Sequence, residues 1–295
     1  MNLLEKTKLL IKQTHLRPDK LKGQNFCIDE KVLQEMIVAA ELKADETVLE
    51  VGPGFGFLTD KLVQKCGKVV AVELEPVLAS LLKKSEWLSS TIGGNLEVVF
   101  GDILKFRPEA YQPMAEDQNS STHSLKKFKI VANLPYGITS VFLKKFLTGE
   151  HKPESMTLLV QQEVAERICA LPGEMSLLGL SVQLYAKPKI IKKVGSVCFW
   201  PQPKVVSAIL KIEDIHDFPF AKQTEEKFFW QVLRAGFCAK RKTLENNLSN
   251  SFHLNKAEVK KIIEKIGLLG NVRAQELSLD NWLAVAVALQ KVIKR

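Results

Sequence analysis

Asn133, Leu134, Pro135 and Tyr136 form a tetrapeptide whose polar groups suit a planar ring that bears an amine. The Asn133 side-chain carbonyl can accept a hydrogen bond from an amine, and the backbone carbonyls of Leu134 and Pro135 are further acceptors. Proline stiffens the loop, and the Tyr136 ring offers a flat face on which a nucleobase can stack. The same residue types are common in turns, so a plain strand-ending turn is the alternative.

The tetrapeptide follows an apolar, β-prone run at residues 129–132, which predicts a buried strand. Ligands in open α/β sheets bind outside the carboxyl ends of the strands. Residues 47–51 form a similar pattern and run into a glycine-rich turn that starts at Gly52. Glycines let a ligand approach the backbone closely. The dinucleotide fingerprint needs a further glycine where this chain has Phe57, so pyrophosphate binding is disfavoured.

Two carboxylates follow the next two strand patterns, at residues 68–73 and 96–100. Glu73 lies 21 residues after Gly52, where a carboxylate can accept both hydroxyls of a ribose. Asp102 is placed to accept hydrogen bonds from an adenine amine. A solvated loop charge is the alternative for Glu73. We expect these residues and the tetrapeptide to converge at one edge of a parallel sheet.

Charge is distributed unevenly along the 295 residues, which carry a net charge of +9. Residues 1–31 carry +3, residues 32–215 are neutral, and residues 216–295 carry +6. A neutral catalytic body with basic ends suits a polyanionic partner, and a generally basic soluble protein is the alternative.

The cysteine and histidine patterns exclude several classes of protein. The five cysteines are scattered without a C-x-x-C pair, and the five histidines lack metal-ligand spacing, so we expect neither a disulfide framework nor a metal site. No apolar stretch reaches the roughly 18 residues that span a bilayer, and no early apolar run has a cleavage site. The sequence therefore predicts a reduced, cytoplasmic protein without a membrane segment.

Strand and helix patterns alternate up to about residue 215, and only helical patterns follow. This order predicts an α/β fold with a Rossmann-like sheet at residues 1–215, which include a basic N-terminal arm at residues 1–31. A smaller, all-helical domain is expected at residues 216–295. A polar stretch at residues 108–127 has the composition of a long surface loop, and we assign it no function.

Two further groups of side chains suit nucleic acid. Lys240, Arg241 and Lys242 lie beside Thr and Asn residues in the helical part, which fits phosphate contacts on RNA. A solvated face is the alternative for this cluster. Phe199 lies in an aromatic, proline-containing loop, where it can close over a base, although the residues alone favour core packing.

The sequence resembles the bacterial ribosomal RNA small-subunit adenine dimethyltransferases, the kasugamycin-sensitivity enzymes, from about residue 20 to the end. The marks of this resemblance are Gly23-Gln24-Asn25-Phe26, Leu49-Glu50-Val51-Gly52-Pro53-Gly54, Asn133-Leu134-Pro135-Tyr136, Gln162-Glu163-Val164-Ala165 and Arg241-Lys242-Thr243-Leu244. The tetrapeptide is shared with macrolide-resistance methylases of large-subunit RNA and with mitochondrial relatives. The last two motifs resemble the small-subunit enzymes specifically.

The resemblance implies a methyltransferase sheet of about seven strands and S-adenosylmethionine as the cofactor. The residues that it implies as cofactor contacts are Asn25, Cys27, Gly52, Glu73, Asp102 and Asn133. The family usually has Leu where this chain has Cys27, and that contact is through the backbone. Phe199 matches the aromatic residue expected above the target base. The implied reaction dimethylates two adjacent adenosines in the 3′-terminal hairpin of 16S ribosomal RNA, in an immature small ribosomal subunit, and we expect a monomer.

A mechanism follows from these residues. An adenine amine is a poor nucleophile because its lone pair is drawn into the ring, and hydrogen bonds to Asn133 and to the Leu134 or Pro135 carbonyl favour its pyramidal form. The cofactor's methyl group is already activated, so the protein mainly positions it in line with the amine, and no strong general base is required. The target base must leave its stack, with Tyr136 and Phe199 on its two faces.

Three other functions remain open. One is a macrolide-resistance-type adenine methyltransferase of 23S ribosomal RNA. Another is a noncatalytic RNA-binding or assembly factor with the same fold. The third is an α/β dehydrogenase, which Phe57 and the lack of a hydride-transfer site disfavour.

Overall fold

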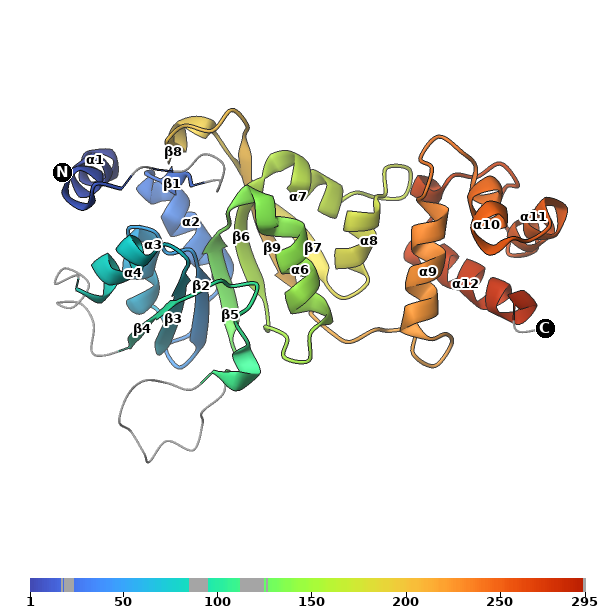
Figure 1. Ribbon diagram of the computed structural model, residues 1–295, viewed down its shortest axis with the longest axis horizontal. Helices are drawn as coiled ribbons and strands as arrows, with labels where there is room; N and C mark the ends of the chain where they lie inside the picture. The colour runs from blue at the N-terminus through green and yellow to red at the C-terminus, as the bar shows by residue number, and fades with distance from the viewer. Residues whose placement is uncertain (17, 19–23, 85–94, 112–124, 126, 294–295) are drawn as a thin grey trace. The chain divides into compact units, whose positions relative to one another are not determined.

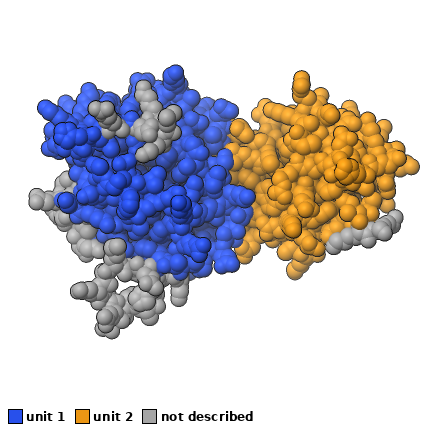
Figure 2. All heavy atoms as spheres, in the orientation of Figure 1, with its two compact units in different colours: residues 1–165, 187–215 blue, residues 166–186, 216–295 orange. Residues whose placement is uncertain are grey.

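The computed structural model describes residues 1–16, 18, 24–84, 95–111, 125 and 127–293. Part of the predicted basic arm and most of the predicted loop at residues 108–127 lie outside the described residues. The chain forms two compact units, which have different colours in Figure 2. The first contains residues 1–165 and 187–215, and the second contains residues 166–186 and 216–295.

A seven-stranded sheet forms the centre of the first unit (Figure 1). Its strands are β2 (Thr47–Val51), β3 (Lys68–Glu73), β4 (Leu96–Phe100), β5 (Lys129–Asn133), β6 (Met156–Gln161), β7 (Lys187–Val194) and β9 (Ser207–Glu213). Their order across the sheet is β4-β3-β2-β5-β6-β9-β7. The first five run parallel, and β9 is antiparallel to both of its neighbours. The predicted Rossmann-like sheet of about seven strands is confirmed.

The parallel strands form where the sequence is apolar on both faces, as sheets covered on both sides require. In β5, Ile130, Val131 and Ala132 are all fully buried. The helices of this unit are α1 (Leu3–Thr14), α2 (Glu30–Ala40), α3 (Phe57–Val63), α4 (Pro76–Lys83), α6 (Thr139–Thr148) and most of α7 (Gln162–Ile168). Helix α2 packs on β5, β6 and β9, and α4 packs on β3 and β4.

The N-terminal arm, which the sequence marks only as basic, contains helix α1. Its start is a capping box, in which Asn2 Oδ1 accepts from the Glu5 N–H at 2.9 Å and Glu5 Oε2 accepts from the Asn2 N–H at 3.2 Å. The Lys6 ammonium lies 5.6 Å from the centre of the Phe57 ring at the start of α3. The arm is therefore packed on the sheet-containing unit.

A second, two-stranded sheet ties this arm to a distant part of the chain. Strand β1 (Phe26–Cys27) pairs antiparallel with β8 (Phe199–Trp200), and Cys27 lies opposite Phe199. The Ile28 N–H also donates to the Cys198 carbonyl at 2.8 Å. The C-terminal part of the arm is thus held by the segment that precedes β9.

The second unit is helical. It contains α8 (Leu177–Gln183), α9 (Glu226–Gly236), α10 (Leu244–Phe252), α11 (Lys256–Lys265) and α12 (Leu279–Ile293). Its core includes Trp282, which is fully buried and stacks on Phe237 with ring centres 5.6 Å apart. Tyr185 joins the earlier segment to α9, since its hydroxyl accepts from Trp230 Nε1 at 2.9 Å. Residues 166–186 belong to this unit together with the chain after residue 215. Among the described residues, no helix is long and apolar enough to cross a membrane.

Candidate functional site

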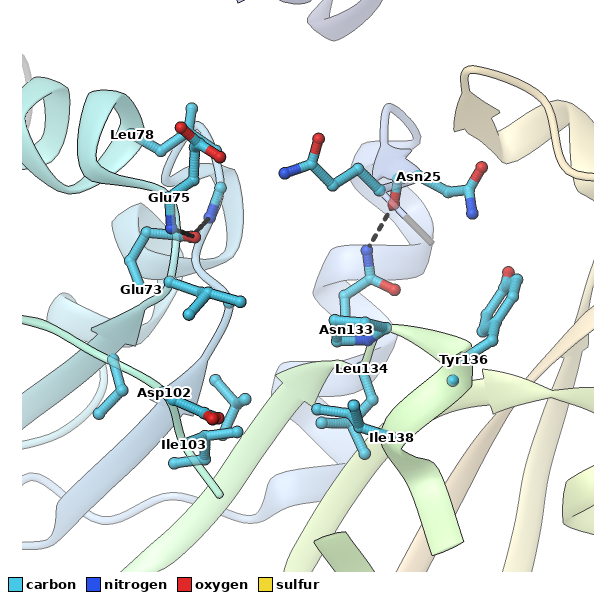
Figure 3. Close-up of a pocket in the computed structure, with 18 of the residues that line it drawn as sticks. Asn25, Glu73, Glu75, Leu78, Asp102, Ile103, Asn133, Leu134, Tyr136 and Ile138 are labelled. Carbon is cyan, nitrogen blue, oxygen red and sulfur yellow. Dashed lines mark hydrogen bonds between the residues drawn. The ribbon is translucent and has the colours of Figure 1, made fainter. Parts of the chain in front are cut away.

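A cavity of about 340 Å³ lies at the carboxyl ends of β2, β3, β4 and β5. The predicted residues that line it are Asn25, Gly52, Glu73, Asp102, Asn133, Leu134, Pro135 and Tyr136. Figure 3 shows Glu73 and Asp102 on one side of this cavity, and Asn133 and Tyr136 on the other. The strand ends therefore bring most of the predicted site together.

The glycine-rich turn after β2 needs glycine at Gly52 and Gly54. Their φ angles are +62° and +60°, in the left-handed region that other residues rarely adopt. A Cβ atom at Gly54 would also lie 3.0 Å from the Phe26 ring, whereas one at Gly52 would meet nothing within 4 Å. The open space at Gly52 lets a ligand reach the backbone of the turn.

Glu73 lies at the end of β3 and fastens two loops of the cavity. Its Oε2 accepts from the Gly54 N–H at 3.0 Å, and its Oε1 accepts from the Glu75 N–H at 2.8 Å. Burial raises the pKa of this carboxyl, and the two N–H bonds oppose the rise. A carboxylate has about four lone-pair sites, so Glu73 can still accept ligand hydroxyls.

Asp102 is held by the turn that follows β4. Its Oδ1 accepts from the Leu104 N–H at 2.9 Å, and its backbone carbonyl accepts from the N–H groups of Lys105 and Phe106, both at 2.9 Å. The carboxylate lines the cavity beside Ile103. With Oδ1 engaged by one donor, it retains capacity for a ligand amine.

Asn133 is the last residue of β5, and its amide has a fixed orientation. Its Nδ2 donates to the backbone carbonyl of Asn25 at 2.9 Å. Because a backbone carbonyl can only accept, the amide nitrogen must face Asn25. The Asn133 oxygen then takes the other direction, on the side of Tyr136 (Figure 3).

The rest of the tetrapeptide is anchored through its backbone. The Leu134 N–H donates to the Leu159 carbonyl of β6 at 3.2 Å, and the Leu134 side chain is buried. The Pro135 carbonyl accepts from the Ile138 N–H at 3.2 Å, which starts the short 3₁₀ turn η2 (Tyr136–Ile138). The stretch is therefore a turn at a strand end and also part of a cavity wall.

The Tyr136 hydroxyl is 2.7 Å from the hydroxyl of Ser207, the first residue of β9. Burial raises the pKa of Tyr136, while the bond to Ser207 acts in the opposite direction. The phenol therefore stays protonated at neutral pH, and either hydroxyl can be the donor in this pair. The sequence offers no signal for this contact, because the two residues are 71 positions apart.

Two predicted site residues do not reach the large cavity. Phe199 is only 2% exposed and belongs to the hydrophobic core, and its predicted role above the target base stays a prediction. Cys27 lines a small adjacent cavity of about 40 Å³ together with Gly52 and Asn133. Burial raises the pKa of the Cys27 thiol to about 12.

The predicted RNA contacts lie in the second unit. Lys240, Arg241 and Lys242 are exposed in the turn between α9 and α10, and the Lys242 N–H donates to the Ala239 carbonyl at 3.0 Å. No group of three or more potential metal ligands occurs among the described residues.

Several lining residues carry no chemical signal in the sequence. Leu78, Ile103 and Ile138 line the large cavity with apolar side chains. The sequence indicates that they line the cavity only through their positions, a few residues after the ends of strands. Apolar walls beside a few polar groups are typical of a cofactor site.

The fold and the cavity together define the class of protein. At the carboxyl ends of a Rossmann-like sheet lie an open glycine turn, the buried carboxylate of Glu73, a second carboxylate and an Asn-Leu-Pro-Tyr wall. These groups fit the ribose, the adenine and the sulfonium side chain of S-adenosylmethionine. The chain is an S-adenosylmethionine-dependent methyltransferase.

Comparison with known proteins narrows the class. The family described as Ribosomal RNA adenine dimethylase matches residues 18–291, and the chain belongs to this family. The chain is 37% identical over 281 residues to Ribosomal RNA small subunit methyltransferase A of Dehalococcoides mccartyi (strain 195), covering 95% of this chain and 91% of the relative. It is 34% identical over 290 residues to the protein of that name from Clostridium perfringens, covering 97% and 95%.

Two solved structures share the fold. The crystal structure of a dimethyladenosine transferase from Plasmodium falciparum superposes with a TM-score of 0.71 and 25% identity, covering 89% of this chain and 96% of that one. The 23S rRNA methyltransferase ErmE superposes with a TM-score of 0.68 and 26% identity, covering 90% and 100%. The predicted family, cofactor and methyltransferase activity are confirmed, and a dehydrogenase is excluded.

Proposed function

We propose that the protein dimethylates the exocyclic amines of two adjacent adenosines in the 3′-terminal hairpin of 16S ribosomal RNA. The observation that carries the site assignment is the hydrogen bond from Asn133 Nδ2 to the Asn25 carbonyl, at 2.9 Å. It turns the Asn133 oxygen away from Asn25, and in that direction the oxygen can accept a hydrogen bond from the target amine. The similarity to two small-subunit methyltransferases over nearly the whole chain supports 16S RNA as the substrate.

The second acceptor for the amine is the Leu134 carbonyl. The Pro135 carbonyl already accepts a hydrogen bond from the Ile138 N–H at 3.2 Å, so it points into the turn. Two hydrogen bonds from the amine, to Asn133 and Leu134, draw its lone pair out of conjugation with the ring. Tyr136 stacks on the extruded base.

S-adenosylmethionine, when bound, supplies an activated methyl group. Glu73 accepts hydrogen bonds from its ribose, Asp102 accepts from its adenine amine, and Gly52 permits close backbone approach. Asn25 and Asn133 lie at the end of the cavity away from Glu73 (Figure 3). The protein then contributes position and desolvation, and the amine needs no strong base.

The helical unit is proposed to bind the RNA backbone through Lys240, Arg241 and Lys242. All three are exposed, and residues 216–295 carry a net charge of +6. We further propose that the protein acts in the cytoplasm as a monomer, on an immature small ribosomal subunit during its biogenesis.

The test is to map modified adenosines by mass spectrometry in both ribosomal RNAs of cells that lack the protein. We expect loss of two adjacent dimethyladenosines near the 3′ end of 16S RNA, restored by the wild-type gene and not by Asn133→Ala. Loss of a 23S modification instead would indicate a macrolide-resistance-type enzyme. Unchanged modification of both RNAs would indicate a noncatalytic assembly factor.

A further inference from the structure

Tyr136 is held at both ends. At its backbone, the carbonyl accepts from Thr139 Oγ1 at 3.3 Å, and at its far end the hydroxyl meets Ser207 Oγ at 2.7 Å. The bond to Ser207 fixes where the far end of the ring lies, and the bond to Thr139 holds the backbone from which the ring extends. Stacking alone requires only a ring face, and phenylalanine has such a face. The hydroxyl of Tyr136 therefore has a role other than stacking.

Ser207 is a rigid partner for that hydroxyl. It is fully buried at the start of β9, opposite Gln161 of β6 and Val194 of β7. A residue flanked by strands on both sides cannot follow a moving tyrosine. The Ser207 hydroxyl is thus a fixed point of the sheet, close to the cavity wall.

We propose that Ser207 is a positioning residue, whose hydroxyl holds the far end of the Tyr136 ring in the position from which the ring stacks on the target base. This proposal rests on the proposed function, because it requires Tyr136 to meet an extruded adenine. Orienting the ring before the base arrives lowers the entropy that must be lost on stacking. The pair contributes no proton transfer, since both hydroxyls are neutral.

The first test is a double-mutant cycle with Ser207→Ala, Tyr136→Phe and the double variant. We expect each single variant to lower single-turnover methylation at subsaturating RNA by roughly 2- to 13-fold, the effect of one net hydrogen bond. The double variant should lose no more than either single variant, because both remove the same contact. Losses that multiply would show that Ser207 acts independently of Tyr136, which overturns the proposal.

A spectroscopic readout separates orientation from stability. With 2-aminopurine in place of the target adenine, stacking on Tyr136 should quench its fluorescence in the wild-type complex. Ser207→Ala and Tyr136→Phe should both give brighter complexes at saturating protein. The matched control is Thr157→Val, which removes a fully buried hydroxyl of β6 that has no hydrogen-bond partner among the described residues. It should leave rate and fluorescence unchanged.

Failure of this inference differs from failure of the proposed function. If Tyr136→Ala abolishes most methylation while Ser207→Ala and Tyr136→Phe match the wild type, the positioning role is wrong and the site assignment stands. If Tyr136→Ala and Asn133→Ala both methylate at the wild-type rate, the site assignment is wrong. If Ser207→Ala does not fold, Tyr136→Phe removes the same contact without altering a buried strand, and a wild-type rate and fluorescence for Tyr136→Phe would then overturn the proposal.

Discussion

Replacing Asn133 with Asp separates a catalytic role for this residue from a role in the turn. Asp is as suitable as Asn in a turn, so a purely structural residue tolerates the change. In the structure, however, Asn133 Nδ2 donates to the Asn25 carbonyl at 2.9 Å. A carboxylate in that place puts two acceptors face to face, and the side chain must turn away from its position.

The size of the effect follows from this contact. Without the donor, the oxygen that should accept a hydrogen bond from the target amine is misplaced, and losing that bond in the transition state costs about 1–3 kcal/mol. We therefore expect Asn133→Asp to lower the methylation rate by roughly 5- to 150-fold, since 1.4 kcal/mol is about tenfold. Asn133→Ala lacks both polar groups and should lose at least as much.

The assay is single-turnover methyl transfer with saturating RNA and saturating cofactor. Under these conditions weaker binding does not lower the rate, so any loss belongs to the chemical step or to the alignment before it. Circular dichroism of both variants controls for folding. A wild-type rate for Asn133→Asp would falsify the orientation argument and leave only the turn.

Three further predictions concern the cofactor, the RNA and the core. Glu73→Ala should weaken S-adenosylmethionine binding by about 1–3 kcal/mol, and unchanged affinity by calorimetry in a folded variant would remove Glu73 from the site. Neutralising Lys240, Arg241 and Lys242 together should flatten the salt dependence of RNA binding by roughly 0.7–0.9 slope units per lost phosphate contact. An unchanged slope would mean that the cluster is only a solvated face. Burial, with a smaller contribution from the charge of Glu73, raises the pKa of Glu50 from 4.5 to about 8, so the native state keeps a proton that the unfolded state releases. Wild-type stability should then fall relative to Glu50→Gln as the pH rises from 4.5 to 8, and equal melting temperatures across this window would contradict the shift.

The sheet and the strand-end residues could be predicted because their signals are local. Residues 47–51, 68–73 and 96–100 are strands with the predicted bounds, since each is a short apolar run that ends at a clear break. Parallel strands place their carboxyl ends together, which is why Glu73 and Asp102 line one cavity although 29 residues separate them.

The contacts that orient the site could not be predicted, because they join residues without any common pattern. The Asn25 carbonyl that holds Asn133 belongs to the backbone, which every residue has, so no residue type in the sequence indicates this contact. Strand β1 has only two residues, too few to show a period. Phe199 is ambiguous for another reason, since a large aromatic residue suits both a core and a base-stacking surface.

The hydrogen bonds of Asn133 and Tyr136 also bear on how the protein is made. They reach across 108 and 71 residues of sequence, to Asn25 and to Ser207. Asn25 precedes β1, whose pairing partner β8 lies at residues 199–200. During synthesis the N-terminal part emerges first, so β2 to β6 can assemble while this partner is still inside the ribosome. A nascent chain at that stage has the strand ends of the cavity, but the contact that holds Tyr136 can form only once Ser207 of β9 has emerged.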